Sequence, residues 1–403
     1  MGFYNIIEPK YFGEFKCTGS ACPQNCCGRW GRVMWTNEEH ERLVSREMPE
    51  ELRVKISAAF VQEQNPLCTE QAACNTAEKA GADVADRGLY PEQTVWNINL
   101  INSACPFLSE NGLCSLQMQF GEEILSATCA VYPRVSVFNN SVLTRGCFTS
   151  CPEVLRILFT DENALEINLL TVQVRGNTVE FKAVSCESEA DFAKNPALAH
   201  RNELFGLFFD IISEKSAGIE TNLAIGAAAA KTLSEVNENK LPEALERLAE
   251  RLDQTDFFAE RVFMEKPLAA ELFSEIFGRE SIETLFIDGK FDEQKFAEGE
   301  KRLAEILAGR EYFFRNLAKN LLFELKMPFY LTERGIFENF LVYGAAVSLA
   351  KLLATACAVD GNAKLVLERL SELDRTTAHN KNAAEKILAF LERNHFKSTI
   401  QSI

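Results

Sequence analysis

The chain lacks the short motifs that mark many nucleotide-binding and hydrolytic enzymes. It contains four His, and it has no G-x-x-x-x-G-K-S/T loop, no H-E-x-x-H pair, no G-x-S-x-G turn and no G-x-G-x-x-G after a predicted strand. Basic charge is also scarce, since 42 Lys and Arg stand against 58 Asp and Glu and give a net charge of −16. A net negative charge does not favour binding of a polyphosphate chain, so nucleic acid is not expected as a partner.

Long apolar runs and targeting signals are missing as well. Residues 1–10 contain no basic segment followed by an apolar stretch, and Ile6 stands where an N-myristoylation signal requires Ser or Thr. The longest weakly polar stretch, residues 339–350, is much shorter than the ~20 residues that span a bilayer. We therefore expect a soluble, cytoplasmic protein with no membrane partner.

Length and composition indicate a globular protein with more than one structural unit. The 403 residues are 47% hydrophobic and include only 21 Gly and 12 Pro, which is enough apolar material for two or three units. We divide the sequence into a cysteine-rich region over residues 1–160, a β-hairpin and linker over residues 161–195, and a helical domain over residues 196–403.

Local patterns predict the elements of the first half. Thr36 and Glu39 form a capping-box pattern, and Pro152 suits the first position of a helix. The predicted elements are helices over residues 37–63, 121–131 and 152–160, a β-hairpin over residues 167–184 that turns near residues 175–178, and irregular segments over residues 1–36 and 64–95.

Beyond residue 195 apolar side chains recur at helical spacing. Helices are predicted over residues 202–215, 220–237, 241–253, 267–278, 292–309, 311–326, 336–358, 362–374 and 380–394. The small residues at 226–230 predict a close contact between helices. The expected fold class is mainly α, with an N-terminal cysteine-rich, loop-rich metal-cluster region that carries a short β-hairpin, followed by a larger all-helical region.

Cysteine is the informative residue type. Eleven of the 13 cysteines lie within the first 151 residues, at positions 17, 22, 26, 27, 68, 74, 105, 114, 129, 147 and 151. Thiolates are soft ligands for zinc, Cu(I) and iron–sulfur clusters, and short spacings within loops let several of them converge. This clustering predicts a cysteine-ligated metal site.

Three other interpretations of the cysteines remain open. A disulfide framework is disfavoured because no secretion signal is present and the cytosol is reducing. Buried, inert thiols account for Cys186 and Cys357, and for Cys68 and Cys74, but not for the dense spacing elsewhere. Structural zinc is an alternative, although the chain has no C-x-x-C pair.

The residues around the cysteines form a known pattern. Its parts are Tyr11…Phe15-Lys16-Cys17-x4-Cys22-x3-Cys26-Cys27-x2-Trp30, Cys105-Pro-Phe-Leu-x3-Gly112-Leu-Cys114, Cys129-x2-Tyr132-Pro133-Arg134 and Ser150-Cys151-Pro152-Glu153. Over roughly residues 10–155 this pattern resembles the bacterial flagellin lysine-N-methylase (FliB) family. Part of it is also similar to small cysteine-cluster proteins that chelate iron or zinc.

The resemblance implies an enzyme that moves the methyl group of S-adenosylmethionine to lysine side chains of flagellin and that carries an iron–sulfur cluster of the 4Fe–4S type. The cysteines that match the pattern are then the candidate ligands: Cys17, Cys22, Cys26, Cys27, Cys105, Cys114, Cys129 and Cys151. A four-iron cluster takes at most four thiolates. We expect ligands from both the 17–27 loop and the 105–151 segment.

Catalytic residues are less clearly marked. Methyl transfer needs a neutral amine, so the site must lower the lysine pKa or supply a base. Tyr132 and Glu153 are candidates because they lie beside cysteines of the pattern, and a hydrogen bond that shapes the loop is the structural alternative for each. Arg134 is a candidate to hold the carboxylate of the cofactor or to neutralise an anionic cluster, with a structural ion pair as the alternative.

A rival function belongs to a different class of protein. The chain would then be a non-catalytic metal- or iron–sulfur-binding protein, with the helical region as a docking module. Methyl transfer to flagellin distinguishes this function from that of an enzyme. Iron analysis and the visible spectrum distinguish both from a scaffold stabilised by zinc.

Overall fold

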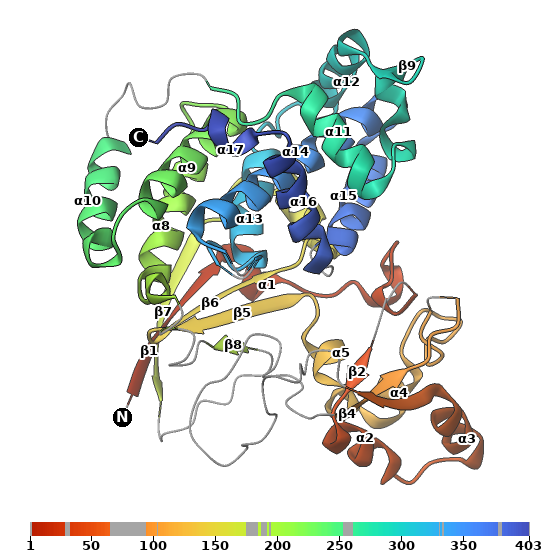
Figure 1. Ribbon diagram of the computed structural model, residues 1–403. Coiled ribbons are helices and arrows are strands. Elements are labelled where there is room, and N and C mark those ends of the chain that lie inside the picture. The colour runs from red at the N-terminus through yellow and green to blue at the C-terminus, as the bar shows by residue number, and fades with distance from the viewer. Residues whose placement is uncertain are drawn as a thin grey trace. The chain divides into compact units, whose positions relative to one another are not determined.

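The structure is a computed structural model. It describes residues 2–28, 33–64, 94–102, 104–174, 184–186, 192, 195–252, 261–329, 331–332, 334–377 and 381–402 (Figure 1). Two compact units alternate along the sequence. Unit 1 comprises Met1–Ile7, Phe15–Arg145 and Leu169–Ala190, and unit 2 comprises Glu8–Glu14, Gly146–Asn168 and Asp191–Ile403. The sequence-based division at residues 160 and 195 uses consecutive ranges instead, and it stays a prediction.

The first half of the chain contains more strands than its sequence suggests. The strands are β1 (Gly2–Pro9), β2 (Met34–Trp35), β3 (Phe60–Gln64), β4 (Thr94–Ile98), β5 (Arg134–Asn139), β6 (Val142–Cys147), β7 (Ile167–Val174) and β8 (Val184–Cys186). The helices are α1 (Lys10–Glu14), α2 (Asn37–Val44), α3 (Glu50–Ala59), α4 (Ser115–Phe120), α5 (Ala127–Val131) and α6 (Pro152–Thr160). The prediction that residues 1–36 are irregular is wrong for β1, α1 and β2.

The predicted capping box is present, but the long helix after it is not. Thr36 Oγ1 accepts a hydrogen bond from Glu39 N at 3.1 Å, and Glu39 Oε2 accepts one from Thr36 N at 2.9 Å. The single helix predicted over residues 37–63 is wrong. Helix α2 ends at Val44, and α3 begins only after Pro49, which has no N–H to continue an earlier helix.

The helix predicted over residues 121–131 is also divided. A short 3-10 helix, Glu122–Ile124, is separated from α5 by an extended backbone at Leu125 and Ser126. Ser126 then caps α5 by accepting a hydrogen bond from Cys129 N at 3.3 Å. The predicted start of a helix at Pro152 is confirmed by α6.

A five-stranded sheet has the order β7-β1-β6-β5-β8. Strand β1 pairs in parallel with β6, and β5 pairs in parallel with β8. Strands β5 and β6 form a hairpin through Asn140 and Ser141, whose φ angles of 46° and 61° suit the two-residue turn that matches the twist of the strands.

The predicted hairpin over residues 167–184 is therefore wrong in its pairing. Strand β7 and strand β8 lie at opposite edges of the sheet, because β7 pairs with β1 and β8 with β5. The turn expected at residues 175–178 lies outside the described residues. A second, three-stranded antiparallel sheet in unit 1 has the order β2-β4-β3.

Unit 2 is dominated by helices, and all nine predicted helices beyond residue 195 are confirmed. They are α8 (Arg201–Ser213), α9 (Ile219–Ser234), α10 (Leu241–Leu252), α11 (Lys266–Phe277), α12 (Glu293–Ile306), α13 (Phe313–Glu324), α14 (Ile336–Asp360), α15 (Ala363–Thr377) and α16 (Lys381–Arg393). A short helix, α17 (Phe396–Thr399), follows, and β9 (Phe286–Ile287) pairs with β10 (Lys290–Phe291). The mainly α fold class is thus confirmed.

Helix α14 is the central helix of unit 2. Among the described residues it is the one helix with the length and composition to cross a membrane, with a mean hydropathy of 1.7 over Ile336–Val359, yet 83% of the tested window is buried inside the protein. Its contact with α9 is close, because a Cβ on Gly226 would overlap the Phe340 ring. The small residues Ala227–Ala230 are buried beside it, as the predicted helix contact requires.

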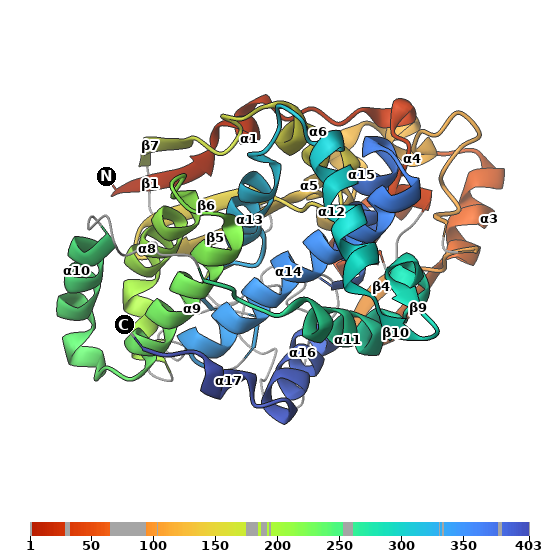
Figure 2. The ribbon, with the colours of Figure 1, turned by 90° about the horizontal axis from the view of Figure 1, so that it is seen from above.

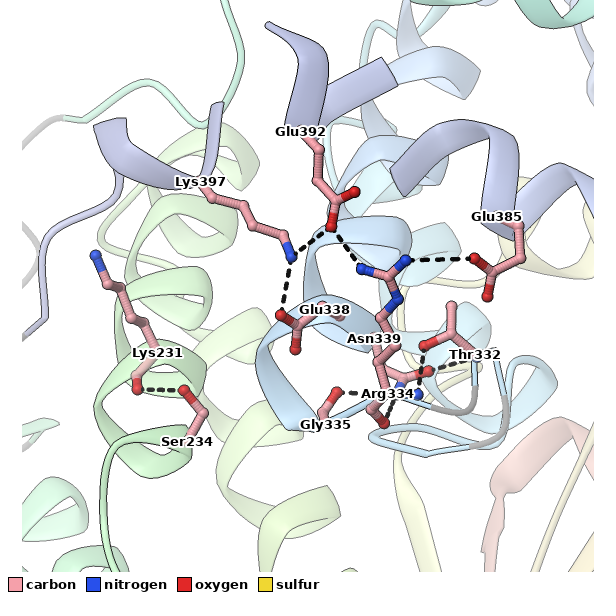
Figure 3. Close-up of polar contacts among 10 residues, drawn as sticks. All are labelled: Lys231, Ser234, Thr332, Arg334, Gly335, Glu338, Asn339, Glu385, Glu392 and Lys397. Atoms are coloured by element: carbon pink, nitrogen blue, oxygen red, sulfur yellow. Dashed lines mark hydrogen bonds and ion pairs between the residues drawn. The ribbon is translucent and has the colours of Figure 1, made fainter. Parts of the chain in front are cut away.

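Ion pairs fasten the C-terminal helices to the start of α14 (Figure 3). Lys397 Nζ lies 2.9 Å from both Glu338 and Glu392. Arg334 lies 2.5 Å from Glu392 and 3.9 Å from Glu385. Several of these side chains are partly exposed, so each ion pair contributes at most about 1 kcal/mol to stability. Together the pairs connect α16 and α17 to the segment where α14 begins.

Candidate functional site

The candidate site of unit 1 is built from two cysteine-bearing loops. Asn25 bridges them, since its Nδ2 donates to Gly112 O at 2.8 Å and its Oδ1 accepts from Cys27 N at 2.9 Å. A backbone hydrogen bond from Cys105 N to Cys27 O, 2.7 Å long, joins the same loops. The loops that carry Cys26 and Cys27 are thus fixed against those that carry Cys105 and Cys114.

A third element brings Cys129 to this place. Cys129 lies in α5, whose cap is Ser126 and whose first N–H, that of Ala127, donates to Glu39 Oε1 at 2.7 Å. Glu39 therefore serves both the capping box of α2 and the start of α5. The thiols of Cys105, Cys114 and Cys129 pack against the hydrophobic core of unit 1, which includes Trp35, Phe107 and Leu116.

The five thiols of Cys26, Cys27, Cys105, Cys114 and Cys129 interact electrostatically with one another. We call them the thiol cluster. A hydrogen bond with Cys26 and burial raise the pKa of Cys27 well above its ordinary value. Burial raises the pKa of Cys105 to about 11 and that of Cys129 to about 12. Such thiols stay protonated until a cation replaces the protons.

The thiol cluster is not a closed coordination site as it stands. Within the part of the chain that the structure describes, no three His, Cys, Asp or Glu side chains form a group that could hold a metal ion. The cysteines of the cluster are half-buried, and none of them is in a disulfide. The arrangement thus offers soft, partly desolvated ligands from three segments, and their assignment as metal ligands stays a prediction.

The three remaining candidate ligands lie apart from this set of interactions. Cys17 is exposed and its Sγ accepts a weak hydrogen bond from Gly19 N at 3.4 Å, while Cys22 is half-buried. Cys151 is buried and belongs to unit 2, where it precedes α6. The structure therefore brings together five of the eight predicted ligands.

The candidate catalytic and cofactor residues occupy different surroundings. Tyr132 ends α5, and Arg134 begins β5 with its guanidinium 5.3 Å from the centre of the Phe15 ring. Glu153, in unit 2, accepts hydrogen bonds of 2.8 Å and 2.7 Å from Arg156 on the next turn of α6. That pair lies within α6, and the roles of Tyr132, Arg134 and Glu153 stay predictions.

A buried polar network in unit 2 is not predicted from the sequence. Tyr11 Oη donates to Asn320 Oδ1 at 2.5 Å and accepts from Cys147 N at 3.1 Å. Asn320 Nδ2 donates to Cys147 O at 2.9 Å. Thr149 donates to Glu324 Oε2 from both N and Oγ1, at 2.8 Å and 3.0 Å. One signal in the sequence indicates this network, because the polar residues Asn316, Asn320 and Glu324 recur at four-residue intervals.

Glu324 also faces a second carboxyl group. Burial raises its pKa well above the ordinary value, and the charge of Asp374 raises it further, whereas the hydrogen bonds from Thr149 oppose the shift. Both side chains are almost fully buried, at 2% and 7% exposure. Since two adjacent buried carboxylates repel one another, the native state favours the protonated form of Glu324 more than the unfolded chain does.

We expect Glu324→Gln to remove part of the pH dependence of stability. Above about pH 4.3, the unfolded chain ionises Glu324 more readily than the native chain, so the free energy of unfolding falls as pH rises towards the raised native pKa. Gln keeps an acceptor for Thr149 and does not ionise. Urea unfolding from pH 5 to pH 8 should show the variant gaining stability relative to wild type as pH rises.

The exposed carboxyl group of Glu305 on α12 provides a matched control for this experiment. Glu305→Gln should leave the dependence of unfolding on pH close to that of wild type, because its surroundings change little on unfolding. Parallel pH profiles for Glu324→Gln and wild type would contradict a raised pKa of Glu324 in the native state.

One comparison with known protein families concerns the second half of the chain. Residues 205–401, all in unit 2, match the family described as the FliB lysine N-methylase C-terminal domain. Lysine-N-methylases of Salmonella choleraesuis and Salmonella typhimurium are 24% and 22% identical over 170 residues, which is 41% of this chain and 35% of each relative. The matched stretch thus spans about a third of the length of these two relatives.

A further relative carries a flagellar name. The flagellar biosynthetic protein FliU of Salmonella muenchen is 24% identical over 165 residues, which is 40% of this chain and 81% of that protein. No solved structure matches the chain.

Proposed function

We propose that this chain, which belongs to the FliB lysine N-methylase family through residues 205–401, is an enzyme that methylates lysine side chains of a protein. The observation that carries the proposal is the match of these residues to the C-terminal domain of lysine N-methylases. Two relatives named lysine-N-methylase support it. The cysteine pattern of the first 155 residues resembles the same family independently.

We propose flagellin as the protein substrate and S-adenosylmethionine as the methyl donor. The name of the FliU relative supports a flagellar substrate. In the reaction, the lysine nitrogen forms a bond to the methyl carbon, and the bond between that carbon and the sulfonium sulfur breaks to leave S-adenosylhomocysteine. The ammonium must first lose a proton, because its ordinary pKa of ~10.4 leaves little free amine at neutral pH.

Tyr132 and Glu153 remain the proposed candidates for proton removal. Glu153 is held by two hydrogen bonds to Arg156, so it would have to exchange this partner to act as a base. Tyr132 adjoins α5, the helix of Cys129. Arg134 is the proposed contact for an anionic group, and its guanidinium is oriented by the ring of Phe15.

We further propose that the thiol cluster supplies ligands to an iron–sulfur cluster of the 4Fe–4S type. Its donors fit such a group in chemistry, because five thiols from three segments interact with one another at the edge of an apolar core. A bound cluster would provide a soft-metal cross-link between the two cysteine loops and α5. A reducing compartment such as the cytoplasm, which we propose as the location, keeps these thiols free for ligation.

Transfer of labelled methyl groups tests the proposed activity. Purified full-length chain, prepared without oxygen, would be incubated with methyl-labelled S-adenosylmethionine and flagellin, and lysine modification would be mapped by mass spectrometry. Label on the ε-nitrogen of lysine is expected. Metal-loaded protein that transfers no label would favour the non-catalytic metal-binding function instead.

A further inference from the structure

Unit 2 contains a pocket whose lining includes no cysteine. It has a volume of about 560 Å³ and lies beside the middle of α14, where Ser348, Lys351 and Leu352 form one wall. Figure 2 shows α14 in the middle of the helices, and α9, α11 and α12 all pack against it. The volume falls within the ~300–1,000 Å³ typical of small-molecule sites.

The pocket lining carries both positive and negative side chains, and not all of them form ion pairs with one another. Lys351 Nζ lies 3.2 Å from Glu220, and Lys266 Nζ lies 3.1 Å from Glu300. Arg261 and Glu265 also line the pocket and are exposed, and no ion pair is found for either among the described residues. One cation and one anion are thus available to a ligand, which is the complement of a zwitterion.

Two helix N-termini meet at the same pocket. Gly218 precedes α9 and Glu265 precedes α11, and neither helix receives a hydrogen bond from the side chain of its cap residue. The first N–H groups of an α-helix carry partial positive charge and favour a carboxylate. This feature alone does not define a site, but it adds to the cation at Arg261.

A buried hydroxyl without a partner is the independent sign of a ligand. Ser348 is 7% exposed, lines the pocket, and its Oγ has no hydrogen-bond partner. Glu220 Oε2, also at the pocket, is buried without a partner, although Oε1 of the same carboxylate binds Lys351. Unpaired buried polar atoms cost free energy, so those at a pocket wall point to a group that completes them.

Part of the pocket lining is apolar. Met264, Phe296 and Leu352 line it, and Lys266 Nζ lies 4.6 Å from the centre of the Phe296 ring. Val262, also in the lining, is 57% exposed. The pocket lining therefore combines charged groups that suit a zwitterion with apolar side chains that would accept a flat heterocycle.

We propose that this pocket binds S-adenosylmethionine. The methionine end, which carries a carboxylate and an ammonium, complements Arg261, the N-terminus of α9 and Glu265, while the adenine ring complements the apolar wall. The inference rests on the proposed function for the identity of the donor. The inference adds a binding site for the cofactor in unit 2 and names the residues that would contact it.

Binding to purified full-length protein tests the proposal directly. Isothermal titration with S-adenosylmethionine, S-adenosylhomocysteine, methionine and adenosine would be combined with thermal unfolding, since a bound ligand raises the unfolding temperature. Arg261→Gln should weaken S-adenosylmethionine binding by about tenfold or more, the scale of one charge-assisted hydrogen bond. Ser348→Ala should weaken binding without lowering the stability of the free protein, because its hydroxyl is unpaired.

Arg302→Gln on α12 is the matched control, since Arg302 is exposed and does not line the pocket. It should bind the cofactor as wild type does. If wild type binds S-adenosylmethionine and methylates lysine while Arg261→Gln and Ser348→Ala bind it equally well, the pocket assignment is overturned and the proposed function stands. Binding of methionine or adenosine alone, without S-adenosylmethionine, would also overturn it. Wild type that neither binds nor methylates would overturn both.

Discussion

Cys129→Ser is expected to lower iron content and methyl transfer together. Serine is a hard ligand whose hydroxyl remains protonated at neutral pH, so it does not replace a thiolate on iron. Loss of an outer-shell partner already weakens metal binding by ~10–100-fold, and loss of a direct ligand should cost more. Iron and sulfide per chain, measured beside methyl transfer to flagellin, check this result.

Cys357→Ser is the control for this substitution. Cys357 is a half-buried thiol of α14 in unit 2, outside both the thiol cluster and the pocket. Its replacement should leave iron content and methyl transfer unchanged. Full methylation by a Cys129→Ser protein that contains no iron would remove the cluster from the mechanism.

Cys22→Ser separates two possible ligand sets. Cys22 matches the family pattern but lies outside the thiol cluster. If the 17–22 segment contributes a ligand, iron content and methylation should fall as they do for Cys129→Ser. Normal iron content in this variant would confine the ligands to the remaining cysteines.

Asn320→Ala should produce a large loss of stability in unit 2. The substitution leaves the Tyr11 hydroxyl without its acceptor and the Cys147 carbonyl without its donor, both in the interior. Each unpaired buried group costs ~1–3 kcal/mol, so the free energy of unfolding should fall by about 3 kcal/mol or more. Urea unfolding monitored by circular dichroism measures this change.

A double-mutant cycle with Tyr11→Phe tests the network itself. Tyr11 and Asn320 share a direct hydrogen bond, so the cost of the double variant should be smaller than the sum of the two single costs. Additive costs would show that the two side chains contribute independently, which contradicts a coupled network.

The helices of unit 2 could be predicted because each one carries its own signal. In α10 the buried residues Leu241, Leu245 and Leu248 recur at helical spacing within a charged sequence. The capping box of α2 is equally local, since Thr36 and Glu39 are three residues apart. Patterns of this kind depend only on near neighbours along the chain.

The sheet could not be predicted because its pairing is not local. Strand β1 pairs with β6, so Asn5 lies opposite Val142 and Ile7 opposite Thr144. The hairpin between β5 and β6 has Asn140 and Ser141 at its turn. This turn lacks the Gly that usually marks such a hairpin. The expected hairpin after residue 167 has suitable alternation, but β1 and β5 provide the actual partners.

The candidate site shows the same division between local and distant information. Spacing predicts that thiols of the 17–27 loop and the 105–151 segment meet, and five of them do interact. Spacing does not reveal that Cys151 belongs to the other unit. The four-residue spacing of Asn320 and Glu324 can be recognised in the sequence. Their hydrogen-bond partners, Tyr11 and Thr149, lie far away along the chain.

Iron, sulfide and zinc analysis of anaerobically purified protein, with a visible absorption spectrum, tests the central claim that the cysteines hold an iron–sulfur cluster. The account predicts about four iron and four sulfide per chain and the broad visible band of a thiolate-bound cluster. Stoichiometric zinc without iron, or protein that contains neither metal yet methylates lysine, would contradict it.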